Sequence, residues 1–357
     1  MKTRVSAAAF AAAALALSLS GCVESGRSST ASAPADSDCP WEPDESVTST
    51  ARIAWQAIPN GDVVVKDLGI LEACMPNAKI KWVQAASGGD VVQYYGSDDV
   101  DLGLMGSSPA TIASSKPVVD DVDIAVVWIH DVIGDAESLI VKDPSITDIS
   151  GLKGTKVAVP FSSTAHYSLL QALTEAGIDP NKDVEVINLD PEKMPAAWQG
   201  GEIDAAWVWD PVQSQLLEDG GERILSSADT AEAGRPTFDV GTASRSFIAE
   251  NPEFLAQWAK AQDWAVKLIQ DDPATAAESV AVVLGIDPAD AQKQFAGLTY
   301  LTAEEQASAD HLGGQFAKDL FNTAGFLLEQ GGIEAVGTEA DYADHVDAGP
   351  AESVSGD

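Results

Sequence analysis

A cluster of small hydroxyl residues stands where an apolar segment gives way to a helical pattern in the middle of the chain. Residues 157–160 are followed by Ser163 and Thr164, and apolar residues then recur with helical spacing. The free N–H groups at the start of a helix attract an anion, because the helix dipole and several donors point the same way. Ser163 and Thr164 are therefore candidates for binding an oxyanion, with an ordinary helix cap as the alternative.

A second loop of the same kind lies earlier in the chain. The largely apolar residues 100–106 end in glycine, and Ser107 and Ser108 then precede Pro109. Proline suits the first turn of a helix, since its fixed φ is helical and its missing N–H is not needed there. We expect Ser107 and Ser108 at a second helix start that binds the same anion.

The segments around these loops alternate between short strands and short helices. Residues 51–56, 79–83 and 100–105 have strand patterns, and helical patterns at 62–75 and 89–95 separate them. Such alternation predicts βαβ units and a mostly parallel sheet. From about residue 253 the chain is helical almost to its end, and we expect these helices to pack on the first lobe.

An internal echo links two distant parts of the chain. Residues 96–109 and 200–211 both contain a glycine, an aliphatic residue followed by aspartate, an apolar strand and a polar loop closed by proline. The repeat predicts two similar α/β lobes whose strand-end loops face one cleft, where open α/β sheets bind ligands.

Composition excludes several classes of protein. The 357 residues are 45% hydrophobic and carry a formal net charge of −36, which disfavours nucleic acid as a partner. The four histidines are scattered without metal-ligand spacing, and no phosphate loop or dinucleotide fingerprint occurs. We expect no metal and no cofactor, and a monomer.

The N-terminus resembles a bacterial lipoprotein signal. A basic start, a short apolar segment and Leu-Ser-Gly-Cys at residues 19–22 predict a signal peptide over 1–21 and a lipid-modified Cys22. A flexible tether over 22–45 would then hold the protein to the outer face of the cell membrane. The remaining pair, Cys39 and Cys74, suggests one disulfide in an exported chain, with two free thiols as the alternative.

Several strings together resemble the taurine-binding proteins of bacterial ABC importers, in the taurine/alkanesulfonate group of periplasmic binding proteins. The resemblance covers about 51–346 and includes the strings at 106–109, 157–170, 196–200, 208–209, 236–239 and 299–302. It implies a two-lobed type II periplasmic-binding-protein fold that closes on its ligand by a hinge. Lobe 1 is expected at 46–141 and 241–340, lobe 2 at 142–240, and an acidic tail at 341–357. The acidic composition beyond Gly337 predicts that this tail is only partly ordered. The implied partners are taurine or a related small sulfonate, an ABC permease and its ATPase.

The resemblance also implies roles for single residues. Taurine carries a sulfonate and an ammonium group, and a desolvated ammonium needs a carboxylate. Asp239 matches the family's ligand-binding aspartate, and Glu137 is the second candidate. Trp209 would form an apolar wall with a possible cation–π contact, unless it belongs to the core. Trp55 and Gln56 stand where the family has an aromatic–Gln pair, and Gln56 would donate to the sulfonate.

Three alternatives stay open at this stage. Asp210 stands where the family pattern has a small neutral residue, so the choice of taurine over other sulfonates is in doubt if Asp210 faces the cleft. An alkanesulfonate or nitrate receptor would have the same fold. A pyrimidine-biosynthesis enzyme of this fold is also conceivable, although no Gly-x-Ser-x-Gly elbow occurs and the export signal argues against it.

Overall fold

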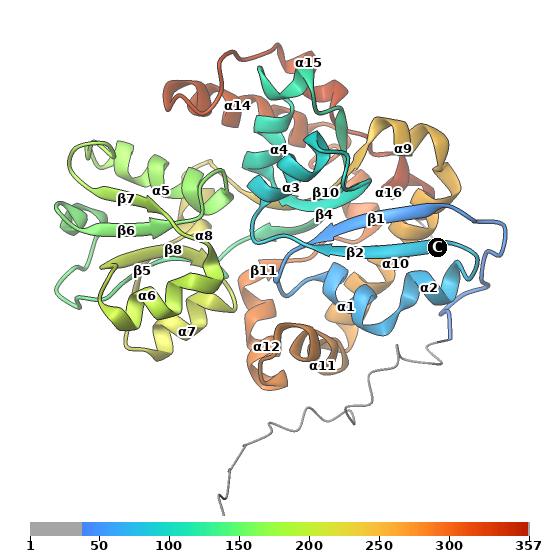
Figure 1. The fold of residues 1–357 in the computed structure, drawn as a ribbon, viewed down its shortest axis with the longest axis horizontal. Coiled ribbons are helices and arrows are strands. Elements are labelled where there is room, and N and C mark those ends of the chain that lie inside the picture. The colour runs from blue at the N-terminus through green and yellow to red at the C-terminus, as the bar shows by residue number, and fades with distance from the viewer. Residues whose placement is uncertain (1–37, 356–357) are drawn as a thin grey trace, which may run out of the picture. The chain divides into compact units, whose positions relative to one another are not determined.

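The computed structural model describes residues 38–355, and its first sheet has six strands (Figure 1). The strand order is β11-β4-β10-β3-β1-β2, with β1 parallel to β2 and β3, and β10 antiparallel to β3 and β4. These strands are β1 (Thr50–Trp55), β2 (Lys79–Gln84), β3 (Leu102–Gly106), β4 (Ile124–Ile133), β10 (Phe238–Ser244) and β11 (Leu298–Thr299). Strands β3 and β4 are almost wholly buried, as expected for strands covered on both faces.

The second sheet has five strands in the order β7-β6-β8-β5-β9. They are β5 (Glu137–Val141), β6 (Lys156–Val159), β7 (Glu185–Asn188), β8 (Ala205–Trp209) and β9 (Glu222–Ser226). The expected boundary after residue 141 was wrong, because β5 pairs with β8 and β9 and so belongs to this sheet. A short apolar strand shows in sequence, but the strands it will pair with do not.

The two sheets share one topology. In each, three neighbouring strands are parallel, and the next one is antiparallel: β2-β1-β3 then β10, and β7-β6-β8 then β5. Strands β3 and β8, which carry the two halves of the sequence echo, take the same place in their sheets. The prediction of a two-lobed periplasmic-binding-protein fold is confirmed.

Helices cover both sheets (Figure 1). Those that follow strands of the second sheet are α5 (Thr164–Glu175), α6 (Met194–Gly200), α7 (Val212–Glu218) and α8 (Ser227–Glu232). The others are α1 (Gly61–Leu68), α2 (Ile70–Cys74), α3 (Gly88–Gly96), α4 (Ser107–Ala113), α9 (Arg245–Glu250), α10 (Pro252–Asp271), α11 (Pro273–Leu284), α12 (Pro288–Gln294), α13 (Ala303–Ala307), α14 (Gln315–Glu329), α15 (Glu339–Asp344) and α16 (Gly349–Val354). Short 3-10 turns are η1 (Val118–Asp120), η2 (Ile149–Leu152), η3 (Pro191–Lys193) and η4 (Phe295–Gly297).

The core follows the sheets. One apolar cluster fills the space around the first sheet, including Trp128 and Trp258, which pack edge to face with ring centroids 6.2 Å apart. Two smaller clusters lie on the second sheet, one containing Trp207 and the other Trp198. Neighbouring residues of a strand point to opposite faces, so separate clusters against one sheet mean that both of its faces are covered.

The C-terminal region is ordered, contrary to the acidic tail expected at 341–357. Tyr342 in α15 is 1% exposed and its hydroxyl lies 2.8 Å from Ser115 Oγ. Ala351 and Val354 of α16 are also buried. The acidic composition concealed this apolar face, which residues at helical spacing provide.

The start of the described chain is also fixed. Cys39 and Cys74 form the predicted disulfide, and Trp41 Nε1 donates to Gln257 Oε1 at 2.9 Å. The last part of the predicted tether therefore packs against the first sheet's helices. The predicted signal peptide and the lipid attachment at Cys22 lie outside the described residues.

Candidate functional site

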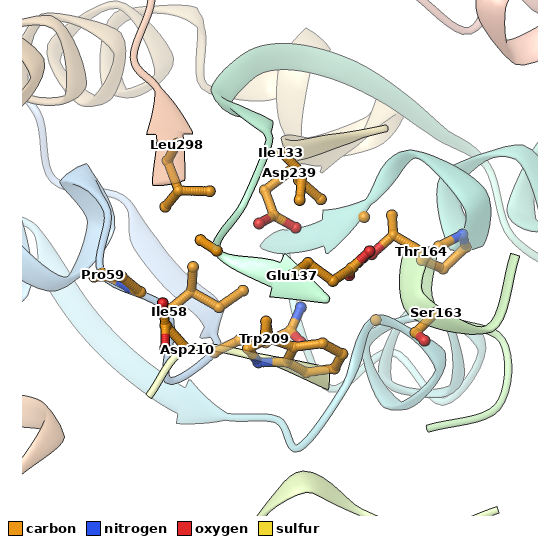
Figure 2. Close-up of a pocket in the computed structure, with 15 residues that line it drawn as sticks. Ile58, Pro59, Ile133, Glu137, Ser163, Thr164, Trp209, Asp210, Asp239 and Leu298 are labelled. Carbon is orange, nitrogen blue, oxygen red and sulfur yellow. Dashed lines mark hydrogen bonds between the residues drawn. The ribbon is translucent and has the colours of Figure 1, made fainter. Parts of the chain in front are cut away.

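A pocket of about 410 Å³, part of it open to solvent, is lined by residues of both sheets (Figure 2). The chain passes between the sheets twice, after β4 and after α8, and the first of these passages borders the pocket. Within the described chain no Lys or Arg lines it. The lining residues are Gln56, Ile58, Pro59, Gly88, Gly106, Pro109, Ile133, Ala136, Glu137, Ser163, Thr164, Trp209, Asp210, Asp239 and Leu298.

One side of the pocket is the start of α5. Ser163 caps this helix, since its Oγ accepts from His166 N at 3.1 Å and donates to Pro160 O at 2.6 Å. Thr164 Oγ1 donates to Glu137 Oε2 at 2.6 Å. Both hydroxyl protons are thus already used within the protein. The donors left for a ligand are backbone N–H groups of the first turn, which have no partner inside a helix.

Glycines bring other helix starts to the same place. A Cβ at Gly88, the first residue of α3, would lie 2.5 Å from Pro109 Cγ. A Cβ at Gly106, just before α4, would lie 2.5 Å from Thr164 Cγ2. Such separations are too short for real atoms, so a side chain at either position would require its neighbour to move. The start of α3 therefore lies against α4, and the start of α4 lies against the start of α5.

Ser107 and Ser108 do not line the pocket, although both are buried at the start of α4. Ser107 Oγ accepts from Phe238 N at 3.2 Å. Ser108 Oγ has no hydrogen-bond partner among the described residues. The sequence placed these serines at a helix start correctly, but the pocket is bordered there by Gly106 and Pro109 instead.

Carboxyl groups form another side of the pocket. Asp239 on β10 is 6% exposed, and it stands directly opposite Asp131 on β4, which is fully buried. Burial and the nearby Glu137 raise the pKa of Asp239 to about 8. Burial, followed by the charges of Asp239 and Glu137, raises the pKa of Asp131 well above its usual value. In Figure 2, Asp239 lies beside Ile133 near the top centre of the view, and Ser163 lies to its lower right.

Glu137 lies between these two sides. It is 1% exposed, and its carboxylate accepts from Thr164 Oγ1 at 2.6 Å and from Ser227 Oγ at 2.7 Å. Burial raises its pKa to about 7, against the effect of these hydroxyl donors. Glu137 thus fixes the starts of α5 and α8 to β5, in addition to bordering the pocket.

Trp209 and Asp210 follow one another at the end of β8, and both line the pocket. Asp210 accepts from Ser214 Oγ at 2.6 Å and from Gln213 Nε2 at 3.2 Å, so its carboxylate is held against the first turn of α7. Burial raises its pKa to about 6. The carboxylate that departs from the family pattern therefore does face the cleft. Trp209 separates the pocket from a neighbouring groove, because it lines both.

Of the predicted aromatic–Gln pair, only Gln56 lines the pocket. Its Nε2 donates to Leu104 O at 2.9 Å, so its amide hydrogen atoms are partly used. Trp55 points into the neighbouring groove, where Lys66 Nζ lies 4.5 Å from its ring centroid. The two residues diverge because successive side chains of a strand point to opposite faces.

Sequence reasoning missed Asp131 and the apolar wall formed by Ile58, Pro59, Ile133 and Leu298. The signal for Asp131 was present, since it interrupts the otherwise apolar β4, whose burial pattern is almost continuous. Charged groups inside such a strand are rare unless they are paired or functional. Ile58 and Pro59 come from a loop and Leu298 from the two-residue strand β11, which carry no pattern of their own, whereas Ile133 ends β4.

Within residues 38–355, no group of three or more His, Cys, Asp or Glu side chains is arranged to hold a metal ion. No helix in the same part of the chain has the length and apolar character needed to cross a bilayer.

Comparison with known proteins gives consistent results. The model of the NMT1-like family matches residues 63–284. The chain is 36% identical to the taurine-binding periplasmic protein of Escherichia coli over 275 residues, 75% of this chain and 82% of that protein.

Solved structures share the fold. The alkanesulfonate-binding protein SsuA from Xanthomonas axonopodis, bound to MOPS, has a TM-score of 0.66 at 24% identity, covering 87% of this chain and 98% of that one. The periplasmic aliphatic sulphonate-binding protein SsuA from Escherichia coli has a TM-score of 0.67 at 24% identity, covering 84% and 92%. On its sequence match and its fold, this chain belongs to the NMT1-like family of periplasmic binding proteins.

Proposed function

We propose that this protein is the extracytoplasmic substrate-binding component of an ABC importer, and that it captures taurine and delivers it to a permease. One observation carries the proposal: a single small pocket has a helix start on one side and a buried carboxylate, Asp239, on another. Taurine has a sulfonate and an ammonium group two carbons apart. The pocket offers a complement to each.

The sulfonate is assigned to the start of α5. A sulfonate stays ionised and accepts through three oxygens, and free N–H groups at a helix start suit such an anion. The approach of Gly88 and Gly106 brings further backbone donors to the same point. No Lys or Arg is needed at this side, because the sulfonate stays ionised by itself and backbone N–H groups can bind an ionised oxyanion.

The ammonium group is assigned to Asp239. Removing an ammonium ion from water costs several kcal/mol unless a carboxylate pairs with it. Asp239 borders the pocket and has no Lys or Arg partner within the described chain, so its carboxyl group is free to pair with an ammonium group. Trp209 and Ile58 supply apolar contacts for the two carbon atoms between the charged ends.

The proposal includes location and partners. The similarity to a periplasmic taurine-binding protein and the lipoprotein-like start of the sequence support an exported protein tethered through Cys22. Its partners would be a membrane permease and the ATPase that drives it. The protein would act as a monomer.

We also propose that the protein is not an enzyme. Ser163 is the nucleophile candidate in the pocket, but its hydroxyl donates to Pro160 O. His166 Nδ1 instead accepts from Ser162 N at 3.3 Å. A nucleophile needs a base within hydrogen-bond reach of its own proton, and Ser163 has no such base among the described residues.

Calorimetry of the purified chain, freed of bound ligand by unfolding and refolding, tests the proposal. We expect taurine to bind with a Kd on the order of 1 µM, about −8 kcal/mol. Ethanesulfonate, which lacks the amine, β-alanine, which has a carboxylate for the sulfonate, and nitrate should bind far more weakly. Equal affinity for ethanesulfonate would support an alkanesulfonate receptor, tight nitrate binding a nitrate receptor, and turnover of any ligand an enzyme.

A further inference from the structure

A pair of aspartates faces one another beneath the pocket. Asp131 and Asp239 are direct partners on the antiparallel strands β4 and β10. Side chains of such partners project to the same face, with Cβ atoms roughly 5 Å apart. Asp131 is fully buried and Asp239 is 6% exposed, so Asp239 borders the pocket and Asp131 lies behind it.

The surroundings of the pair are acidic or neutral. The titratable groups nearby are Glu137 of β5, Asp210 before α7 and the phenol of Tyr300, which donates to Pro59 O at 2.6 Å. Asn60, buried after β1, adds a neutral amide. Within residues 38–355, neither aspartate is paired with a cation.

The nearest basic groups do not supply a counter-charge to the aspartate pair. His130 precedes Asp131 on β4 and therefore points to the other face of the sheet, where its ring packs 6.0 Å from Trp258. Arg223 acts on Asp210 but pairs with Asp135 at 3.3 Å. Two neighbouring carboxylates in a buried site cannot both ionise without a counter-charge.

We propose that Asp131 and Asp239 hold one proton between them when the pocket is empty, and that the ligand's ammonium group displaces this proton to solvent. This inference rests on the proposed function. Taurine enters as a zwitterion, the pair loses one proton, and both aspartates are then ionised, with Asp239 against the ammonium and Asp131 behind it. The ligand's positive charge replaces the proton, so the charge of the carboxylate site is unchanged.

The exchange makes Asp131 a specificity-determining residue. A sulfonate without an amine brings no cation to replace the proton, so the pair keeps its proton, and its remaining negative charge finds no partner on that ligand. An amine-bearing ligand instead competes with a proton, and its affinity rises with pH while the empty pocket is protonated. The raised pKa of Asp239, about 8, places this dependence around neutral pH.

Calorimetry of the full chain with taurine at pH 7, in buffers of different ionisation heat, measures the protons released. We expect about one proton per taurine, and an affinity that rises up to tenfold per pH unit between about pH 6 and 7.5, by linkage. Ethanesulfonate should release none. Tight taurine binding with no proton release in every buffer would overturn the inference and leave the proposed function intact.

Two variants locate the proton. In Asp131→Asn, the amide supports an ionised Asp239, so taurine should bind with much less proton release and a flatter pH profile. Asp62→Asn, which removes a buried carboxyl group that does not line the pocket, should retain the release of the wild type. Release that survives unchanged in Asp131→Asn would place the proton on another group and contradict the proposal. If Asp131→Asn does not fold, the buffer series on the wild type still decides between exchange and no exchange.

Discussion

The two charged sides of the pocket are built on different principles. At the start of α5, the donors are backbone N–H groups, and the nearby hydroxyls of Ser163 and Thr164 are already bonded within the protein. Across the pocket, Asp239 and Asp131 are ionisable groups whose pKa values burial raises. Fixed dipoles suit an anion whose charge is permanent, whereas a buried carboxylate pair suits a cation that can replace a proton. One side should therefore be insensitive to pH, and the other should titrate.

The same contrast appears between two strand ends that occupy equivalent places in their sheets. After β3, the chain continues through Gly106 into α4, and the missing side chain lets α5 approach. After β8, it continues through Asp210 into α7, and the Asp210 side chain accepts from Ser214 of that helix and borders the pocket. The two strands take equivalent places in their sheets, but they border the pocket with different groups. The residue after or at each strand end decides whether the pocket is bordered by bare backbone or by a carboxylate.

Asp239→Asn should break the carboxylate side most strongly. We expect taurine affinity to fall about 100- to 1,000-fold, since an unpaired buried ammonium costs about 3–5 kcal/mol, while ethanesulfonate changes less than about threefold by the same reasoning. Parallel calorimetric titrations of both ligands give the comparison. Equal losses for the two ligands would show that Asp239 does not hold the ammonium group.

Gly106→Ala should break the helix-start side. The new methyl group would collide with Thr164 Cγ2 and move α4 away from α5, so taurine and ethanesulfonate should both weaken by about tenfold or more, at about 1.4 kcal/mol per tenfold. Gly325→Ala is the matched control, because nothing lies within 4 Å of a Cβ there. Unchanged binding in Gly106→Ala, measured by the same titrations, would remove the assignment of the sulfonate to this side.

Trp209→Ala should show whether Trp209 limits the length of the ligand that fits between the two sides. Because Trp209 lines both the pocket and the neighbouring groove, its removal should join them and weaken taurine by about tenfold through lost apolar contact. The affinity of 3-aminopropanesulfonate relative to taurine should rise in fluorescence or calorimetric titrations. A ratio equal to that of the wild type would mean that Trp209 does not limit ligand length.

The pH dependence of stability should show the smallest but broadest effect. Asp239 and Asp62 have pKa values raised to about 8 and about 7, so the folded chain binds more protons than the unfolded one. Stability therefore falls as pH rises through these values. Between pH 6.5 and 8.5 the melting temperature of the ligand-free chain should drop by several degrees. His130 and His166, whose pKa values burial lowers in the folded chain, oppose this drop only near pH 6.5, where histidines of the unfolded chain are still partly protonated.

Variants divide this slope between the pocket and the rest of the protein. Asp239→Asn should flatten part of it. Asp62→Asn, which alters a buried carboxyl group bonded to Gln262 Nε2 at 2.6 Å and absent from the pocket lining, should flatten another part. If Asp62→Asn abolished the whole slope, the pocket carboxylates would not titrate in this range.

Much of the fold could be predicted from local patterns. Alternating strands and helices, the echo of 96–109 in 200–211 and the loop before α5 all have local signals, and each corresponds to an observed element. The partners of β5 and the packing of α15 and α16 had no such signal, because they depend on contacts between distant segments. The acidic composition of the C-terminal region indicated a partly ordered tail, whereas α15 and α16 contain buried residues.

The pocket was predicted less completely, for similar reasons. Gln56, Glu137, Ser163, Thr164, Trp209 and Asp239 all border it. Trp55 does not, because strand alternation turns it away from Gln56. Asp131 was missed because its relation to Asp239 exists only through the pairing of β4 with β10. A local pattern can indicate a helix start, but two facing carboxylates can be predicted only when the pairing of their strands is known.

A crystal structure of the taurine complex would locate both ends of the ligand in the pocket. We expect sulfonate oxygens about 3 Å from the backbone nitrogens of Thr164 and Ala165, and the ammonium nitrogen at a similar hydrogen-bonding distance from the Asp239 carboxylate. A ligand bound in the reverse orientation, or bound outside this pocket, would contradict it.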